Sequence, residues 1–190
     1  RLAKILSERS RRVDGLELNL SCPNLNRGDP EESCITAQNE KAVYRIVKAV
    51  RAATGLTVIA KLSPNVTDIG KMARASEAGG ADAVSLVNTF LGLAVDVRTR
   101  RPKLGNITGG LSGPAIRPIA LRMVWEVYAQ VGIPVIGMGG IMDWADAVEF
   151  IICGATAVQV GTANFVNPKA PAEIASGIER YLAKNGIRSV

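Results

Sequence analysis

Cys22 and its polar neighbours are the residues of this sequence whose types and spacing point most directly to chemistry. The run Leu16–Asn24 alternates leucines with three polar residues, Glu17, Asn19 and Ser21. A two-residue period is typical of a strand with two different faces. Buried polar groups need partners, and a bound ligand can supply them. Pro23 ends the strand, so we expect Cys22 and the flanking amides Asn19 and Asn24 to lie together at its carboxyl end. The alternative is an ordinary strand end with a buried thiol.

The sequence contains no histidine, and this narrows the chemistry that such a site can use. Ser-His-Asp and Cys-His catalysis are excluded, so a general base must be Cys, Asp, Glu, Lys or Tyr. Three cysteines, at positions 22, 34 and 153, fit neither a disulfide framework nor a zinc site. We therefore expect no metal and a reducing, cytoplasmic setting. Cys34 is a rival nucleophile without flanking amides, and Cys153 is expected in the core.

Lys61 is the second residue that suggests a ligand. It lies within an otherwise apolar predicted strand, residues 57–63, where a solvated lysine is not expected. A buried ammonium needs an electron-rich partner. A reduced flavin would serve, because negative charge develops at its N1 and O2 atoms. The alternative is a structural ion pair with Glu17 or Asp82.

Two glycine clusters follow the last two predicted strands, at residues 138–141 and 160–163. Glycines there allow backbone N–H groups to point at an anion without obstruction. Phosphate sites in α/β barrels are frequently built by the loops after the last two strands. Glycine is also the ordinary residue for turning a corner, but the pair of clusters favours the phosphate of a mononucleotide.

These residues are carried by strands that alternate with helices. We predict five strands, at residues 16–22, 57–63, 83–88, 134–140 and 157–162. Alternation of this kind indicates βαβ units and a parallel sheet. A complete (β/α)₈ barrel takes roughly 250 residues. We therefore expect an α/β fold, an incomplete TIM barrel of about five βα units whose N-terminal strands are missing, with residues 1–190 as a single domain.

Helix boundaries and loops follow from local signals. Asp68 and Asp143 are expected helix N-caps, and the pair Gly79-Gly80 should end one helix. One helix should bury a stripe made of Ile119, Met123, Val127 and Val131. Residues 89–117 show no element of their own and end in a glycine-rich stretch, so we expect a long loop that belongs to the site.

Composition restricts the class of protein further. The chain is 47% hydrophobic and 21% charged, which suits a globular unit with a sizeable core. No apolar run approaches about 18 residues, so no membrane span is expected. The net charge is +6, but the basic residues are dispersed and only 4% of residues are aromatic. A solvated basic surface explains this pattern better than nucleic-acid binding does.

Six motifs in this chain combine these features: residues 18–24 (LNLSCPN), 60–68 (AKLSPNVTD), 87–89 (VNT), 109–118 (GGLSGPAIRP), 136–141 (IGMGGI) and 160–164 (VGTAN). Together they resemble class 1 dihydroorotate dehydrogenases, and most of all their NAD-linked branch. The resemblance implies a TIM barrel that uses FMN to oxidise dihydroorotate to orotate in pyrimidine synthesis. It further implies that electrons leave through a separate iron–sulfur and FAD subunit, and that the protein is a homo-oligomer.

The resemblance also assigns roles to residues. Cys22 would be the base that removes the C5 proton while C6 gives its hydride to flavin N5. The pyrimidine would be held by Asn19, Asn24, Asn88 and Thr89. The flavin would be held by Asn19, Lys61, Gly113, Gly139, Gly140, Gly161 and Thr162.

One departure from the family pattern and one related family leave two alternative functions open. The segment Leu25–Pro30 is shorter than the flap that follows the Cys-Pro-Asn motif in this branch. Dihydropyrimidine dehydrogenases share the Cys-Pro motif, although Asn24 favours dihydroorotate. The other alternative is a non-catalytic barrel fragment with weak phosphate binding, which associates through open strand edges and through apolar interior positions such as Val84 and Leu86.

Overall fold

The computed structural model describes residues 1–9, 13–21 and 36–188. Its helices are α1 (Leu2–Arg9), η1 (Thr36–Gln38), α3 (Glu40–Arg51), α4 (Ile69–Ala78), η2 (Pro114–Ile116), α5 (Arg117–Tyr128), α6 (Trp144–Ile152), α7 (Ala163–Val166) and α8 (Ala170–Lys184). Its strands are β1 (Gly15–Asn19), β2 (Thr57–Lys61), β3 (Ala83–Leu86), β4 (Phe90–Leu93), β5 (Val95–Asp96), β6 (Arg101–Pro102), β7 (Thr108–Leu111), β8 (Val135–Met138) and β9 (Ala157–Gln159).

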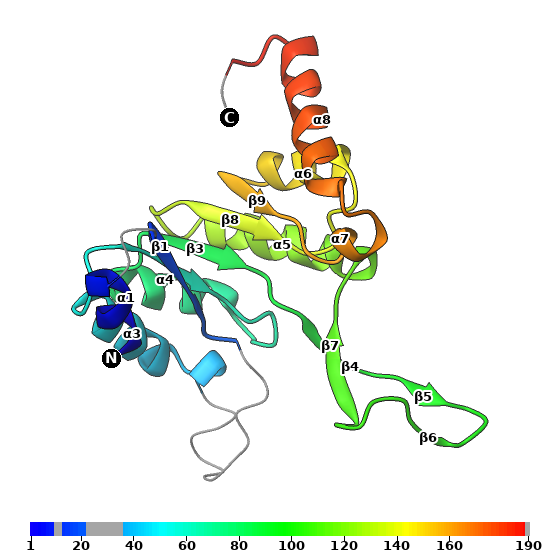
Figure 1. The fold of residues 1–190 in the computed structure, drawn as a ribbon, viewed down its shortest axis with the longest axis horizontal. Helices are drawn as coiled ribbons and strands as arrows, with labels where there is room; N and C mark the ends of the chain where they lie inside the picture. The colour runs from blue at the N-terminus through cyan, green and yellow to red at the C-terminus, as the bar shows by residue number, and fades with distance from the viewer. Residues whose placement is uncertain (10–12, 22–35, 189–190) are drawn as a thin grey trace.

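A parallel sheet of five strands forms the centre of the molecule (Figure 1). The strand order is β1-β2-β3-β8-β9, so each main strand pairs with the next one along the chain. Helices α3, α4, α5 and α6 connect or follow these strands and cover one face. This is the winding of a TIM barrel wall, and the predicted strand positions are confirmed to within a few residues. Within the described residues, β1 and β9 are the two edges of the sheet.

Side chains at the helix ends explain where the helices begin. The Asp68 carboxylate accepts the backbone N–H of Lys71 at the start of α4. Asp143 caps α6 in a reciprocal capping box with Asp146. Gly79 ends α4, as the sequence predicts, and Gly80 follows with φ +93°. None of the helices in the described residues is long and apolar enough to span a membrane.

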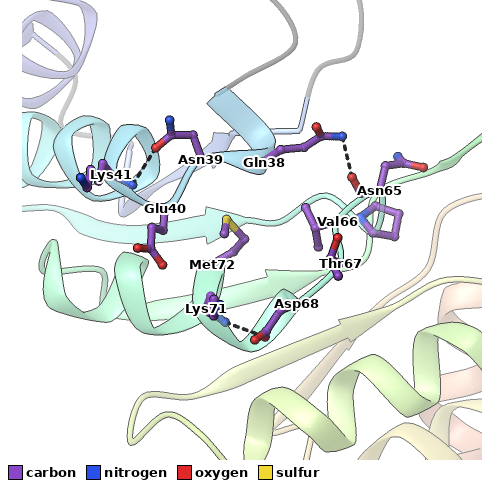
Figure 2. A pocket seen from close by; sticks show the side chains of 11 residues that line it. Gln38, Asn39, Glu40, Lys41, Asn65, Val66, Thr67, Asp68, Lys71 and Met72 are labelled. Atoms are coloured by element: carbon purple, nitrogen blue, oxygen red, sulfur yellow. Dashed lines mark hydrogen bonds between the residues drawn. The ribbon is translucent and has the colours of Figure 1, made fainter.

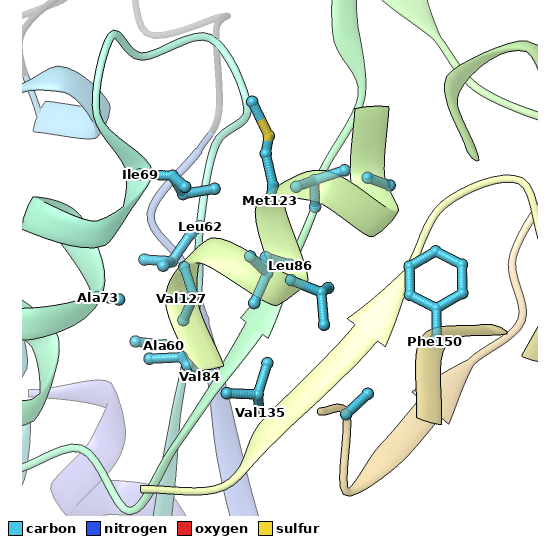
Figure 3. Close-up of a cluster of buried hydrophobic side chains, with 14 of the residues drawn as sticks. Ala60, Leu62, Ile69, Ala73, Val84, Leu86, Met123, Val127, Val135 and Phe150 are labelled. Atoms are coloured by element: carbon cyan, nitrogen blue, oxygen red, sulfur yellow. The ribbon is translucent and has the colours of Figure 1, made fainter. Parts of the chain in front are cut away.

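The hydrophobic core lies between the sheet and its helices (Figure 3). Val84 and Leu86 of β3 are fully buried in this core, beside Val127 of α5. Their expected position on the barrel interior is therefore wrong, because it is Ser85 that faces the interior, where it donates to Glu17. The expected stripe of α5 is wrong at Ile119, which is 41% exposed.

Residues 90–111 contain strands that the sequence analysis does not predict. Strands β4 and β7 pair in antiparallel fashion, and β5 pairs with β6 beyond them. Together they form an arm that projects from the carboxyl side of the sheet (Figure 1). Large side chains on the arm, such as Leu93 and Ile107, are more than half exposed. The prediction of a long loop without elements is therefore wrong for this segment.

Candidate active site

A cavity of about 400 Å³ opens at the carboxyl ends of the central strands. Eight of the residues predicted for the site line it: Lys61, Asn88, Thr89, Gly113, Gly139, Gly140, Gly161 and Thr162. They come from β2, from the segments after β3, β8 and β9, and from the turn before η2. Parallel strands place their carboxyl ends at one edge, and this is why residues distant in sequence meet here. Cys22 and Asn24 lie outside the described residues.

The glycines of the cavity wall have backbone conformations that other residues disfavour. Gly113 has φ +90°, Gly139 has φ +127° and Gly140 has φ +76°. A Cβ on Gly140 would meet the carbonyl oxygen of Gly113 at 2.7 Å, so the two turns approach each other closely. Gly161 differs, because a Cβ there would meet nothing within 4 Å and would enter open space.

A hydroxyl pair links the two sides of this glycine cradle. Thr162 Oγ1 donates to Ser112 Oγ at 2.8 Å, which joins the turn after β9 to the segment before η2. Both residues line the cavity. The motif at residues 109–118 contains Ser112, but the sequence analysis does not single it out as a site residue.

Amides and hydroxyls form a second group near the end of β1. Asn88 Nδ2 donates to Asn19 Oδ1 at 3.2 Å and also to Ser21 Oγ. Asn19 Oδ1 in turn accepts the Ser21 hydroxyl at 2.8 Å. The structure therefore brings Asn19 to Asn88, although Asn19 does not itself line the cavity. Thr89 continues the group, since its backbone N–H donates to Asn88 Oδ1.

Lys61 is paired with a carboxylate on the neighbouring strand. Its Nζ lies 3.5 Å from Glu17 Oε2, whereas Asp82 pairs with Arg51 instead. Glu17 Oε1 accepts from Ser85 Oγ at 2.7 Å and from Gln159 Nε2 at 3.0 Å. Burial alone would raise the pKa of Glu17, but these hydrogen bonds and the Lys61 charge hold that pKa below its ordinary value of 4.5.

The described cysteine does not belong to this site. Cys153 caps the carboxyl end of α6 and is half-buried, where burial and the nearby Glu149 raise the pKa of its thiol. A raised pKa disfavours the thiolate and so disfavours reactivity. Its expected place in the core is correct only in part, because Cys153 packs against the core but is only partly buried. Within the described residues, no group of His, Cys, Asp and Glu side chains could hold a metal ion.

A second and larger hollow, of about 940 Å³, lies at the start of α3 and α4 (Figure 2). Three of its polar side chains are already engaged in the local structure. Asn39 caps α3, Asp68 caps α4, and Gln38 Nε2 donates to the Asn65 carbonyl. Because these groups satisfy backbone atoms of the chain itself, the hollow offers less for a ligand than the glycine-lined cavity does.

Comparison with known proteins identifies the family. The sequence profile of the family described as "Dihydroorotate dehydrogenase" matches residues 2–182. The chain belongs to the dihydroorotate dehydrogenase family. The membership agrees with the resemblance that the motifs indicate and with the incomplete barrel that the structure shows.

Named relatives in the dihydroorotate dehydrogenase family are more than 50% identical to this chain. A protein of Bacteroides fragilis is 53% identical over 188 residues, which are 99% of this chain and 60% of that protein. A protein of Geobacter metallireducens is 57% identical over 178 residues, which are 94% of this chain and 57% of that protein. Both are named "Dihydroorotate dehydrogenase B (NAD(+)), catalytic subunit". The chain thus spans about 60% of the length of these relatives.

A solved dihydroorotate dehydrogenase has the same fold. The crystal structure of the Eimeria tenella enzyme in complex with ferulenol superposes with a TM-score of 0.76 at 22% identity. The match covers 98% of this chain and 54% of that one. At this identity the comparison shows the fold alone, namely that the described sheet and helices superpose on about half of that dihydroorotate dehydrogenase.

Gln159 is a further residue of the cavity that the sequence analysis does not identify. It lines the cavity from β9 and donates to Glu17. The available signal is the one used for Lys61, a polar residue inside an apolar strand, here Ala157-Val158-Gln159. Gln159 lies within the predicted strand over residues 157–162, but the sequence gives no indication that its side chain reaches Glu17, 142 residues away in the chain.

Proposed function

We propose that this chain forms the flavin- and pyrimidine-binding part of an NAD-linked dihydroorotate dehydrogenase, which oxidises dihydroorotate to orotate in cytoplasmic pyrimidine synthesis. The observation that carries the proposal is the single cavity in which Lys61, Asn88, Thr89 and both glycine turns meet. Membership of the family supports the reaction class, and the name of the relatives supports the NAD-linked branch.

The cavity wall fits FMN. Gly139, Gly140 and Gly161 present backbone without side chains, which lets N–H groups reach a phosphate. The open space beside Gly161 leaves room for that group. The Lys61 ammonium would face the part of the ring where negative charge develops on reduction. FMN, when bound, supplies the acceptor for the hydride of the substrate.

The polar group at the end of β1 fits a pyrimidine. Asn88, Asn19 and Ser21 already exchange hydrogen bonds, so their amide and hydroxyl groups are oriented before a substrate arrives. Cys22 follows Ser21 directly in the chain. In this proposal its thiolate accepts the C5 proton of dihydroorotate, a role that a cysteine can fill near neutral pH in an electropositive site.

A partner protein is part of the proposal. The relatives are named catalytic subunits, a term that implies at least one further subunit. We propose that this subunit carries an iron–sulfur cluster and FAD and passes electrons on to NAD. Residues 1–190 would form one domain of the assembly.

The test uses a chimaera, because the chain spans 60% of its relatives. The part of the Bacteroides fragilis protein that lies outside the match is joined to residues 1–190. We expect a yellow protein that binds FMN and forms orotate from dihydroorotate. Cys22→Ser in the chimaera should lower turnover by roughly 100- to 10,000-fold, the usual contribution of a positioned general base, and should leave FMN binding intact.

Cys153→Ser is the matched control, since it makes the same change at a half-buried cysteine outside the cavity. It should leave turnover unchanged. Equal turnover in the Cys22→Ser variant would remove Cys22 from the role of base. Uracil reduction without orotate formation would favour the dihydropyrimidine dehydrogenase alternative, and a chimaera that binds no FMN would contradict the cofactor.

A further inference from the structure

The Glu17 carboxylate is the centre of a polar network on the inner face of the sheet. Ser85 Oγ and Gln159 Nε2 both donate to its Oε1, at 2.7 and 3.0 Å. Its other oxygen, Oε2, lies 3.5 Å from Lys61 Nζ. The Glu17 carboxylate thus accepts contacts from three strands other than its own, and these contacts approach it from several directions.

The network connects strands that are not neighbours in the sheet. Glu17 belongs to β1 and Gln159 to β9, which are the opposite edges of the strand order. Their hydrogen bond therefore joins the first and last strands directly, across the concave side. A carboxylate held in this way has little freedom to move. Lys61 Nζ, which it contacts through Oε2, is therefore restrained as well.

The same contacts couple the network to the cavity. Lys61 and Gln159 line the cavity, whereas Glu17 does not. Among the described residues, Glu17 is the only carboxylate that forms an ion pair with Lys61. Ser85 and Gln159 carry no charge, so Lys61 is the charged side chain that contacts Glu17. Glu17 can therefore act on a ligand in the cavity through the lysine.

We propose that Glu17 is a positioning residue, which holds Lys61 Nζ at the cavity wall and sets how much of its positive charge a bound ligand experiences. This inference rests on the proposed function, in which the ligand is FMN. An ammonium that is paired with a carboxylate stabilises negative charge on a reduced flavin less than an unpaired ammonium does. Glu17 thereby keeps the midpoint potential of the flavin lower than Lys61 alone would.

The first test measures the midpoint potential of FMN in the chimaera by spectroscopic redox titration. Glu17→Gln removes the charge and keeps a carbonyl oxygen that can accept from Ser85 and Gln159. We expect an upward shift in the potential. Lys61→Met should shift it downward. In the Lys61→Met background, the shift caused by Glu17→Gln should be largely lost, because Glu17 acts through the lysine.

Glu126→Gln is the control, since Glu126 pairs with Arg122 on the outer surface of α5 and lies outside the cavity. It should leave the potential unchanged. Equal shifts for Glu17→Gln with and without Lys61 would overturn the positioning role and indicate a direct effect of the carboxylate. An unchanged potential in Glu17→Gln alone would also overturn it.

A ligand-free test separates this inference from the proposed function. In the chimaera without FMN, urea unfolding is measured for Glu17→Gln, Lys61→Met and the double variant. The proposal predicts non-additive losses of stability, because each partner restrains the other. If FMN does not bind the chimaera, the proposed function fails, but this cycle still shows whether Glu17 and Lys61 restrain each other. Additive losses would overturn the inference.

Discussion

Gly140 and Gly161 line the same cavity but restrict side chains in different ways. Gly140 has φ +76°, and a Cβ there would also meet the Gly113 carbonyl oxygen at 2.7 Å. Replacement of Gly140 would therefore strain the backbone whether or not a ligand is bound. A Cβ on Gly161 has no such conflict within the protein. Gly161 is consequently the position at which ligand binding can be probed separately from folding.

Gly161→Ala should weaken FMN binding by the chimaera without lowering the melting temperature of the FMN-free chimaera, because the added methyl group enters space that the ligand would use. Isothermal titration and thermal denaturation measure the two effects. Gly55→Ala is the control, since a Cβ at Gly55 also meets nothing within 4 Å and Gly55 lies outside the cavity. Any gain in stability from a less flexible unfolded chain is the same in both variants. Equal FMN affinity in the two would argue against a cofactor beside Gly161.

At the level of single residues, much of the described site could be predicted from the sequence. Lys61 is visible as a charge inside an apolar strand, and Asn88 and Thr89 directly follow one. Ser112 and Gln159 were not singled out, because their importance comes from partners far away in the chain. Sequence order shows which strand end a residue occupies, but not which side chain reaches it across the barrel interior.

Helix α6 packs closely on β8 at Gly137 and Phe150. A Cβ on Gly137 would lie 2.6 Å from the Phe150 ring, so the absence of a side chain allows this approach. Phe150 is fully buried (Figure 3). The contact holds α6 against the strand that leads directly into Gly139 and Gly140. Core packing at this point therefore supports one turn of the cavity.

Phe150→Ala should destabilise the chain by about 3–5 kcal/mol, through lost burial and the cavity that remains. Ile152→Ala on the same helix should change stability by no more than about 0.5 kcal/mol, because Ile152 is 73% exposed. Urea unfolding of the FMN-free chimaera, followed by circular dichroism, measures both. A small loss in the Phe150→Ala variant would mean that α6 can collapse onto β8 without the ring.

At the level of elements, the sequence predicts the order of strands and helices well. It predicts less well which side chains of a strand face the barrel interior. Every residue of β3 is buried, so its pattern does not indicate which side chains face the barrel interior. The hydrogen bond from Ser85 to Glu17 decides the orientation. The sequence does not predict the β4–β7 pair, because Gly109 and Gly110 make up half of β7 and give it no side-chain pattern.

The sheet of the described chain has two edges, β1 and β9. An edge strand presents unpaired backbone groups that can pair with another chain. The chain covers 60% of a Bacteroides relative, and the solved dihydroorotate dehydrogenase likewise extends beyond the match. We therefore expect residues 1–190 on their own to associate, to bind FMN poorly and to show little oxidation of dihydroorotate.

Sedimentation velocity over a range of concentrations tests the association. The average mass of residues 1–190 should rise with concentration, whereas the chimaera should reach one defined assembly. The same samples are assayed for flavin absorbance and for orotate formation. A concentration-independent monomer with full activity would contradict the role of the open edges, and it would show that residues 1–190 suffice for catalysis.

The hydrogen bond between Glu17 and Gln159 also has a consequence for the order of folding. Its partners are 142 residues apart in the chain. Closing so long a loop is entropically unfavourable until the intervening strands have paired. We therefore expect the contact to form after the folding barrier has been crossed. Interactions of this kind slow the unfolding rate and leave the folding rate almost unchanged, so Glu17, which we propose restrains Lys61, should also lengthen the lifetime of the native state.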